Sequence, residues 1–203
     1  MEYSIRDVLL DSQSSGINIS DEDKNHYIEL RKFVNNFINS KAIEYSTNLK
    51  EHKLLLDIAP QVHPGASPFT KYSNSLITIQ TLDIDIKSNA MYICDITKNN
   101  STIIKDNTFD FVLCTEVLEH TIQPFDAIKE IYRILKPGGI LFLSVPCNFR
   151  IHGPLPDNLR FTQYGIQKAL LPNDKWKIIE MHALDYIKRP LFPIDYTCVA
   201  KKI

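Results

Sequence analysis

The chain is poor in glycine and has no long apolar segment. Six of its 203 residues are glycine, which is about half the usual ~7%, so a glycine-rich nucleotide loop must be short or altered. No apolar run approaches the ~20 residues that a membrane-spanning helix needs. Residues 1–20 also lack the basic start and apolar stretch of a secretory signal. We therefore expect a protein with no membrane span and a cytoplasmic location.

The chain also lacks an excess of charge of either sign and any paired cysteine motif. Lys and Arg number 23 against 24 Asp and Glu, for a net charge of −1. This balance gives no electrostatic footprint for a phosphate backbone, so no nucleic-acid partner is expected. The four cysteines form no C-x-x-C pair, and their spacing suits neither a zinc site nor a disulfide framework. No metal site is predicted.

The first organised segment is a predicted amphipathic helix over residues 20–42. Ser20 is a candidate N-cap with Asp23 three residues on, and Leu30, Val34 and Phe37 follow at helical spacing. We expect residues 1–48 to form a helical lead on a domain of residues 49–203. The lead is a covering helix, a substrate lid or a dimer element, and the chain is a monomer or a homodimer.

From residue 53 onward, short apolar runs alternate with turns and one clear amphipathic helix that begins at Pro124. Runs of this kind are typical of strands buried on both faces of a parallel sheet. The last two runs have no helix between them and are expected to pair antiparallel. The pattern predicts an α/β fold with a mostly parallel seven-stranded sheet and helices on both faces. The predicted strands are 53–59, 76–83, 90–95, 109–114, 140–145, 176–183 and 195–200.

Acidic residues stand at the ends of four consecutive predicted strands: Asp57, Asp83, Asp95 and Glu116. In open α/β sheets, ligands bind beyond the carboxyl ends of the strands. Four carboxylates there would offer a row of acceptors to a ligand rich in hydroxyl, amine or ammonium groups.

One segment of about forty residues carries a family resemblance. Residues 106–146 read DNTFDFVLCTEVLEHTIQPFDAIKEIYRILKPGGILFLSVP. The acid-x-x-FD-x-V run, the EH pair and the R-x-LKPGG turn before an apolar strand resemble the class I S-adenosylmethionine-dependent methyltransferases, type-11 branch. The resemblance implies a Rossmann-like fold. It also implies S-adenosyl-L-methionine as cofactor, with S-adenosyl-L-homocysteine as product, and methyl transfer to an oxygen in preference to a nitrogen.

The resemblance also assigns roles to the strand-end acids. Asp57 matches the acid that supports the glycine loop and the methionine part of the cofactor. Asp83 matches the acid that accepts hydrogen bonds from the ribose hydroxyls, with Asp85 as a competing candidate. Asp95 matches the acceptor for the adenine amino group, with the backbone of Ile96 beside it.

The end of the fourth predicted strand resembles the part of the family site beneath the sulfonium and amino-acid groups. Cys114, Thr115 and Glu116 fall at this place. His120 matches a histidine frequent in the following turn, where it binds near the cofactor or braces the turn.

The loop after the first strand departs from the family pattern D-x-G-x-G-x-G. Ala59, Gln61 and His63 stand at the three glycine positions. Glycine there permits close ligand approach and positive φ. The loop is therefore expected either to take another path, with Gln61 offering its amide to the cofactor carboxylate, or to bind cofactor poorly.

Residues 147–162 form a long polar loop that is expected to carry the acceptor site. His152 is the candidate general base, because its ordinary pKa suits proton acceptance at neutral pH, although a backbone-bonded loop histidine is an equal alternative. Asp157 and Arg160 form an ion pair that shapes the loop, or Arg160 holds an acidic or sugar acceptor. The loop is similar to one in bacterial type-11 proteins of saccharide and cell-surface glycan pathways, so a small-molecule or saccharide acceptor is expected.

Two functions remain open at this point. The first is an S-adenosylmethionine-dependent methyltransferase. The second is a catalytically silent binding or scaffolding protein that keeps the methyltransferase fold with an altered first loop. A nicotinamide oxidoreductase is disfavoured, because no G-x-G-x-x-G turn follows the first strand.

Overall fold

The seven predicted strands form one sheet, as expected from the sequence. The computed structural model describes residues 20–60, 64–73, 75–186, 189 and 191–203. The strand order is β3-β2-β1-β4-β5-β7-β6, and the last two strands in the chain run antiparallel to their neighbours. The strands are β1 (Lys53–Ile58), β2 (Ile77–Asp83), β3 (Tyr92–Ile93), β4 (Phe109–Thr115), β5 (Leu135–Pro146), β6 (Trp176–Asp185) and β7 (Pro193–Lys202).

Strand β3 is four residues shorter than predicted and β5 is six residues longer, while the ends of the other strands lie within two residues of the predicted bounds. β3 spans two residues and not the predicted six, because it pairs with β2 only at Tyr92 and Ile93 at the sheet edge. β5 begins at Leu135, five residues earlier than predicted, because Leu135 already pairs with Phe109 of β4. The Pro137-Gly138-Gly139 turn therefore lies inside a bulged strand, where Gly138 has a φ of 76°.

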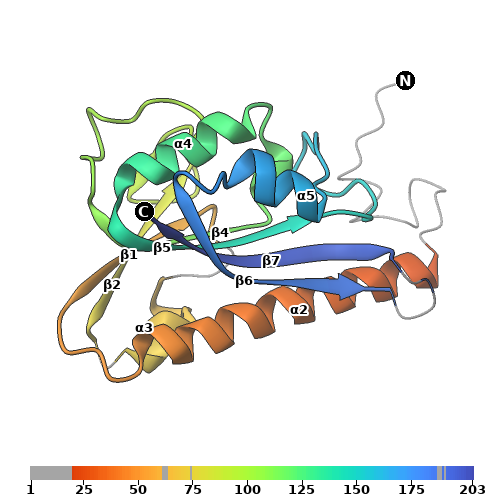
Figure 1. Ribbon diagram of the computed structural model, residues 1–203, viewed down its shortest axis with the longest axis horizontal. Helices are drawn as coiled ribbons and strands as arrows, with labels where there is room; N and C mark the ends of the chain where they lie inside the picture. The colour runs from red at the N-terminus through yellow and green to blue at the C-terminus, as the bar shows by residue number, and fades with distance from the viewer. Residues whose placement is uncertain (1–19, 61–63, 74, 187–188, 190) are drawn as a thin grey trace.

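Helices cover both faces of the sheet (Figure 1). α2 (Asp21–Ser46) and α3 (Pro68–Tyr72) lie on one face, and α4 (Pro124–Ile134) and α5 (Gln163–Gly165) lie on the other. α2 begins as predicted, with the Ser20 hydroxyl accepting the Asp23 N–H at 3.0 Å, and runs four residues further than expected. The remaining helical turns are η1 (Pro64–Ala66), η2 (Leu118–His120) and the π-helical η3 (Ile166–Leu170).

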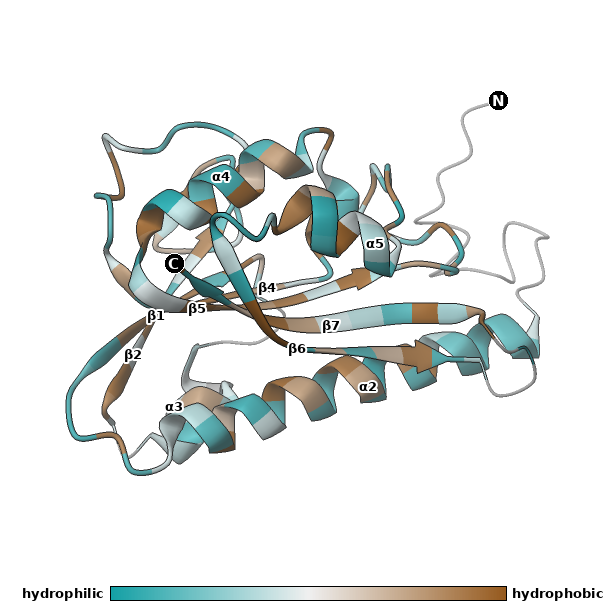
Figure 2. Ribbon diagram, in the orientation of Figure 1, coloured by the Kyte–Doolittle hydropathy of each residue, from teal (hydrophilic) through white to brown (hydrophobic). Residues whose placement is uncertain are grey.

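The core has one apolar layer on each face of the sheet. Under α4 the layer includes Leu56, Leu118 and Trp176. Under α2 it includes Phe37 and Phe142, and Figure 2 shows apolar stretches of β5 and β7 between the two helix layers. No helix of the described residues is long and apolar enough to cross a membrane.

α2 is fixed to the sheet along its length. Leu30 and Val34 pack on Ile194 of β7. Near its end, the largely buried Lys41 forms ion pairs with Glu44, at 2.6 Å, and with Glu180 of β6. The predicted division into a lead of residues 1–48 and a domain of residues 49–203 stays a prediction, since residues 1–19 lie outside the described residues.

Candidate active site

A hollow opens at the carboxyl ends of β1 and β4, on the face that α2 covers. Its volume is about 250 Å³. It is lined by the ends of the two strands, by Ala59 and Ser67 of the β1–α3 connection, by the first residue of α3 and by one face of α2. The lining residues are Arg31, Val34, Asn35, Ile38, Asn39, Asp57, Ala59, Ser67, Pro68, Leu113, Thr115 and Glu116. The structure thus brings together four residues that the sequence assigned to cofactor binding.

Asp57 is the acid at the end of β1, and it is largely buried. Its neighbours in the sheet are Thr81 of β2 and Leu113 of β4, one on each side. Burial raises the pKa of the Asp57 carboxyl from its ordinary value of 3.8 to about 7, because a low-dielectric setting disfavours the charged form. A cationic ligand group in the hollow would reverse this effect.

The backbone turns sharply at both strand ends that border the hollow. Ala59 has a φ of 51° and Glu116 a φ of 54°. A residue with a Cβ pays roughly 1–2 kcal/mol for this left-handed conformation. Ala59, at the first glycine position of the family loop, therefore keeps the backbone form that glycine would adopt. Non-glycine residues in strained conformations cluster at ligand sites.

Glu116 is held at the rim by β5. Its Oε1 accepts the Ser144 hydroxyl at 2.7 Å, and its backbone N–H lies 3.1 Å from the same hydroxyl oxygen. Burial, together with the nearby Glu119, raises the pKa of the Glu116 carboxyl. Asp195 of β7 is fully buried beside it, and burial and Glu116 hold the pKa of Asp195 well above its usual range.

A second group of ionisable side chains lies just beyond Glu116, in η2 and the loop after β5. Glu119 is fully buried. Its Oε1 lies 3.5 Å from His120 Nε2 and 3.7 Å from His152 Nε2. The two imidazole rings meet edge to face, with centroids 5.2 Å apart. Burial lowers the pKa of His120.

The 147–162 loop reaches this group because it folds back onto η2. The backbone carbonyl of Glu119 accepts the N–H groups of Asn158 and Leu159 at 2.7 and 3.2 Å. Asp157 accepts the His152 N–H at 2.8 Å and forms a two-fold ion pair with Arg160. Arg160 also donates to the carbonyls of Phe149 and Arg150, which makes it a brace of the loop.

His152 is enclosed and does not line the hollow. Its side chain is 9% exposed, and its Nδ1 lies 3.1 Å from Asp157 Oδ2, off the line of a good hydrogen bond. Burial acts to lower the pKa of His152, but the neighbouring Glu119 and Asp157 carboxylates raise it overall.

The predicted nucleoside-binding residues lie outside the lining of the hollow. Asp83 Oδ1 accepts the Asp85 N–H at 2.8 Å, so one oxygen of Asp83 holds the turn after β2. Asp95 Oδ1 likewise accepts the Thr97 N–H and hydroxyl at 2.8 and 2.7 Å. Ile96 is buried in the core.

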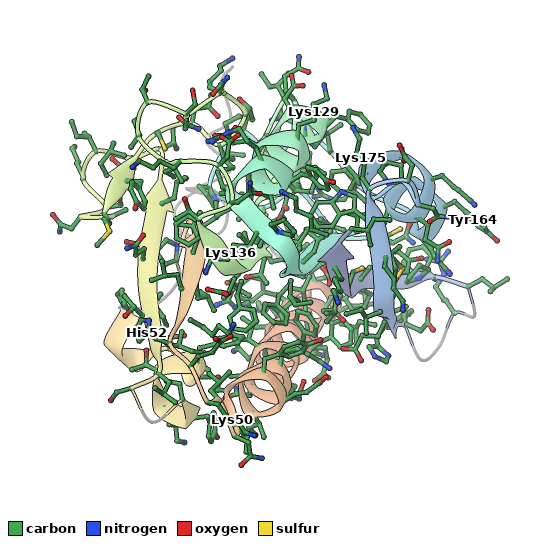
Figure 3. All side chains as sticks on the ribbon, turned by 60° about the vertical axis from the view of Figure 1, so that its left-hand side comes forward. Lys50, His52, Lys129, Lys136, Tyr164 and Lys175 are labelled. Atoms are coloured by element: carbon green, nitrogen blue, oxygen red, sulfur yellow. The ribbon has the colours of Figure 1, made fainter. Side chains whose placement is uncertain are left out.

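Cys114 is a further predicted residue outside the lining. It is fully buried in the core, which raises the pKa of its thiol. Gln61 lies outside the described residues, as does His63. Tyr164 of α5, just after the 147–162 loop, is 75% exposed and projects outward in Figure 3, away from the core.

The sequence interpretation missed the α2 wall of the hollow. Arg31, Asn35 and Asn39 recur every four residues, which places them on one face of a helix. That face adjoins the buried face of Leu30, Val34 and Phe37. The four-residue spacing was the available signal. Glu119 and Asp195 were also missed, since each occupies a buried position that only the tertiary fold defines.

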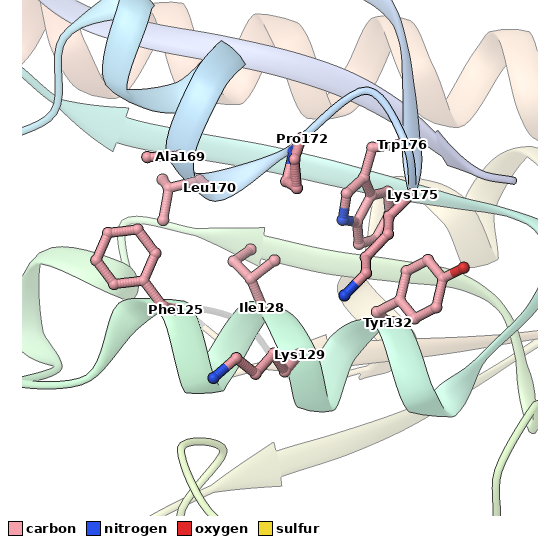
Figure 4. A pocket seen from close by; sticks show the side chains of 9 residues that line it. All are labelled: Phe125, Ile128, Lys129, Tyr132, Ala169, Leu170, Pro172, Lys175 and Trp176. Carbon is pink, nitrogen blue, oxygen red and sulfur yellow. The ribbon is translucent and has the colours of Figure 1, made fainter.

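A separate hollow between α4 and η3 has a different character (Figure 4). Phe125, Ile128, Tyr132 and Trp176 give it apolar walls, and Lys129 and Lys175 stand at its edge. It holds no acid or histidine, so it offers no group for the chemistry predicted from the sequence.

Comparison with known proteins agrees with the sequence interpretation. Residues 62–143 match a family described as a methyltransferase domain. A ubiquinone biosynthesis O-methyltransferase of Haemophilus ducreyi is 44% identical over 45 residues, which cover 22% of this chain and 19% of that protein. The chain thus matches less than a fifth of this relative.

Solved structures share the fold at low sequence identity. A [4+2]-cyclase, SpnF, aligns with a TM-score of 0.56 and 18% identity over 81% of this chain and 79% of its own. The 1,6-didemethyltoxoflavin-N1-methyltransferase of Burkholderia thailandensis, solved with its substrate and S-adenosylhomocysteine, aligns with a TM-score of 0.55 and 13% identity, over 91% and 92%. These alignments confirm the predicted Rossmann-like fold.

Proposed function

We propose that this chain is a class I S-adenosylmethionine-dependent methyltransferase, which transfers a methyl group from S-adenosyl-L-methionine to an oxygen of a small-molecule acceptor. One observation carries the proposal. The ends of the neighbouring strands β1 and β4 each turn through a strained left-handed residue, Ala59 and Glu116, and both residues face one hollow that also contains the buried Asp57.

The hollow suits the methionine part of the donor. Its volume of about 250 Å³ is below the ~300–1,000 Å³ of sites that hold a whole drug-sized ligand. The donor's ammonium group would pair with the Asp57 carboxylate, and its carboxylate with Arg31 of α2. One charge comes from the end of β1 and the other from α2, so together they would fix the orientation of the donor.

The nucleoside would then extend over the ends of β2 and β3. Asp83 ends β2, which lies next to β1 in the sheet. One oxygen of its carboxylate accepts a hydrogen bond within the local turn. We assign the ribose hydroxyls to the other oxygen, and assign Asp85 a part in holding the turn. Asp95 and the backbone of Ile96 would bind the adenine. Gln61 keeps its predicted part in binding the donor carboxylate.

Methyl transfer itself needs positioning and a place for one proton. The sulfonium methyl is already activated, so an in-line approach supplies much of the rate. Thr115 and Glu116 would line the path of the methyl group. In the simplest form of the mechanism, His152 takes the proton of the acceptor hydroxyl, with Asp157 and Arg160 holding its loop in place.

The class of acceptor is inferred from the relatives and from the loop of residues 147–162. The curated relative acts on oxygen in ubiquinone biosynthesis and the toxoflavin enzyme acts on nitrogen. We propose a hydroxyl-rich saccharide acceptor from the resemblance expected of residues 147–162 in the sequence. Hydroxyl groups are poor nucleophiles, which is consistent with ionisable side chains gathered beside Glu116.

A second candidate function is a binding or scaffolding protein without methyl transfer. Two observations favour it: the first loop lacks glycine at the family positions, and one structure of the same fold is named as a [4+2]-cyclase. Fold alone does not determine chemistry.

Calorimetry with the two forms of the cofactor tests the proposal. S-adenosylmethionine and S-adenosylhomocysteine are expected to bind one-to-one, with a matching rise in melting temperature. Binding without turnover on any hydroxyl or amine acceptor would favour the second candidate. No heat and no thermal shift at millimolar ligand would exclude the proposed donor site.

A further inference from the structure

Three donor atoms converge next to the proposed donor site. Oε1 of Glu119 lies 3.5 Å from Nε2 of His120 and 3.7 Å from Nε2 of His152, and one ligand atom from each residue lies within 4.8 Å of the others. Atoms bound at about 2.0–2.1 Å around a tetrahedral ion are roughly 3.4 Å apart. The two distances from Glu119 match this spacing, and the third separation is at most 4.8 Å.

The outer nitrogens of both imidazole rings face oxygen atoms. His120 Nδ1 lies 3.1 Å from the carbonyl oxygen of Pro156, and His152 Nδ1 lies 3.1 Å from Asp157 Oδ2. A proton on each Nδ1 would leave the Nε2 lone pairs directed toward Glu119. Histidine ligands of metal ions usually have a carbonyl or carboxylate partner that fixes the tautomer. His120 has one, whereas His152 Nδ1 lies near Asp157 but off the line of a hydrogen bond.

The nearest partners of the Glu119 carboxylate are the two imidazoles, which lie beyond ordinary hydrogen-bond distance at 3.5 and 3.7 Å. Its side chain is 0% exposed, and neither carboxylate oxygen accepts a hydrogen bond from the described residues. Buried charges in proteins are normally paired or coordinate metals. Since Glu116, Asp157 and Asp195 are also close by, added positive charge would stabilise the whole group.

We propose that Glu119, His120 and His152 form a binding site for a divalent transition-metal ion such as Zn²⁺, Co²⁺ or Mn²⁺. Two imidazoles and one carboxylate suit these ions, whereas Mg²⁺ and Ca²⁺ favour all-oxygen sites. Three protein ligands leave at least one coordination position open. This site was not expected from the sequence, because its two histidines are 32 residues apart in the chain.

The role of the ion rests on the proposed function, whereas its binding does not. An acceptor hydroxyl bound at the open position would lose its O–H proton to solvent at neutral pH, since a bound divalent ion lowers the pKa of a coordinated hydroxyl. The resulting oxyanion would then form a bond to the donor methyl carbon as the carbon–sulfur bond breaks, which leaves S-adenosylhomocysteine. His152 would act as a metal ligand in this mechanism and not as the base.

Titration of the tag-free, chelator-treated full chain with Co²⁺ and Zn²⁺ tests the proposal. We expect one ion per chain by calorimetry and visible absorption bands from bound Co²⁺, with no binding of Mg²⁺ at the same concentrations. Glu119→Gln and His152→Gln should each lower the affinity for Zn²⁺ at least tenfold. Glu119→Gln should fold as well as the parent chain, because an amide of the same size replaces a buried carboxyl group that accepts no hydrogen bond from the described residues.

His182→Gln is the matched control. His182 Nε2 also lies 3.7 Å from an oxygen of Glu180, but its side chain is 62% exposed, and among the described residues no third ligand group completes a site there. Unchanged Zn²⁺ affinity in this variant is expected. Absence of metal binding by the parent chain, or equal loss in His182→Gln and His152→Gln, would overturn the proposal.

The same samples separate this proposal from the proposed function. Metal binding without any binding of S-adenosylhomocysteine would retain the metal site and reject the donor site. Cofactor binding without metal binding would do the reverse, and would return the role of proton acceptor to His152.

Discussion

The most informative single change is Asp57→Asn, because it should affect stability and ligand binding in opposite directions. The folded chain raises the pKa of Asp57 from 3.8 to about 7, so between these values the folded state holds a proton that the unfolded state has lost. Stability of the parent chain therefore falls as pH rises through this window. A shift of about 3 units at 1.36 kcal/mol per unit amounts to about 4 kcal/mol above pH 7.

Asparagine has no proton to lose and no charge to bury. The variant should therefore match the parent near pH 4 and gain about 1.4 kcal/mol per pH unit up to pH 7, to a plateau of at most about 4 kcal/mol. Urea unfolding followed by circular dichroism at pH 5 and pH 8 measures both values. Comparing variant with parent cancels the contributions of the other buried acids. An equal difference at the two pH values would refute the reasoning.

The same variant should lose cofactor affinity at and above pH 7, and the loss should shrink as the pH falls below the pKa of Asp57. An ammonium group of the ligand would pair with ionised Asp57 and not with asparagine, so the affinity of the parent for S-adenosylhomocysteine should rise about tenfold per pH unit up to about pH 7. Calorimetry in buffers of pH 5.5, 6.5 and 7.5 follows this slope. A flat profile in the parent would show that Asp57 does not meet the ammonium group.

Three further changes probe the donor site and the fold. Asp83→Ala should weaken binding of S-adenosylhomocysteine by at least ~1.4 kcal/mol, or tenfold, through a lost charged hydrogen bond; unchanged affinity would assign the ribose to another group. Ala59→Gly should relieve roughly 1–2 kcal/mol of left-handed strain and cost ~0.5–1 kcal/mol in conformational entropy of the chain. The net gain in stability should raise the melting temperature by about 2 °C, and a melting temperature below that of the parent would contradict the strain argument. Gly139→Ala should destabilise by about 1–3 kcal/mol, because the added Cβ would lie 2.9 Å from the carbonyl oxygen of Lys136; full stability in chemical unfolding would show that the turn can shift.

Local patterns were sufficient to predict the sheet and part of the site. The apolar runs define β1 and β4, and the acids that follow them, Asp57 and Glu116, lie at the same sheet edge because parallel strands place their carboxyl ends together. Ala59 was assigned a place in the cofactor loop, and it lines the hollow. Each of these inferences used residues that are close in sequence.

The rest of the site depends on contacts between distant segments. Glu119 meets His152 because the backbone of the 147–162 loop binds the carbonyl of Glu119, and no spacing in the sequence encodes that return. Arg31 and Asn35 resemble an ordinary solvent-facing stripe until α2 is placed over the ends of β1 and β4. Strand β3 was predicted too long, because apolar content alone does not show that an edge strand has one neighbour.

The close packing of α2 against the sheet limits the routes by which ligands can reach the hollow. Swinging this helix aside would expose Leu30, Val34 and Phe37 to water, at a cost of roughly 1.5–3 kcal/mol for each side chain, and would break the Lys41–Glu180 ion pair. Such an opening would be rare at equilibrium. We infer that α2 is a fixed wall of the hollow. Donor and acceptor would then enter and leave past the loops at the strand ends, and the movement of those loops would limit the rate of turnover.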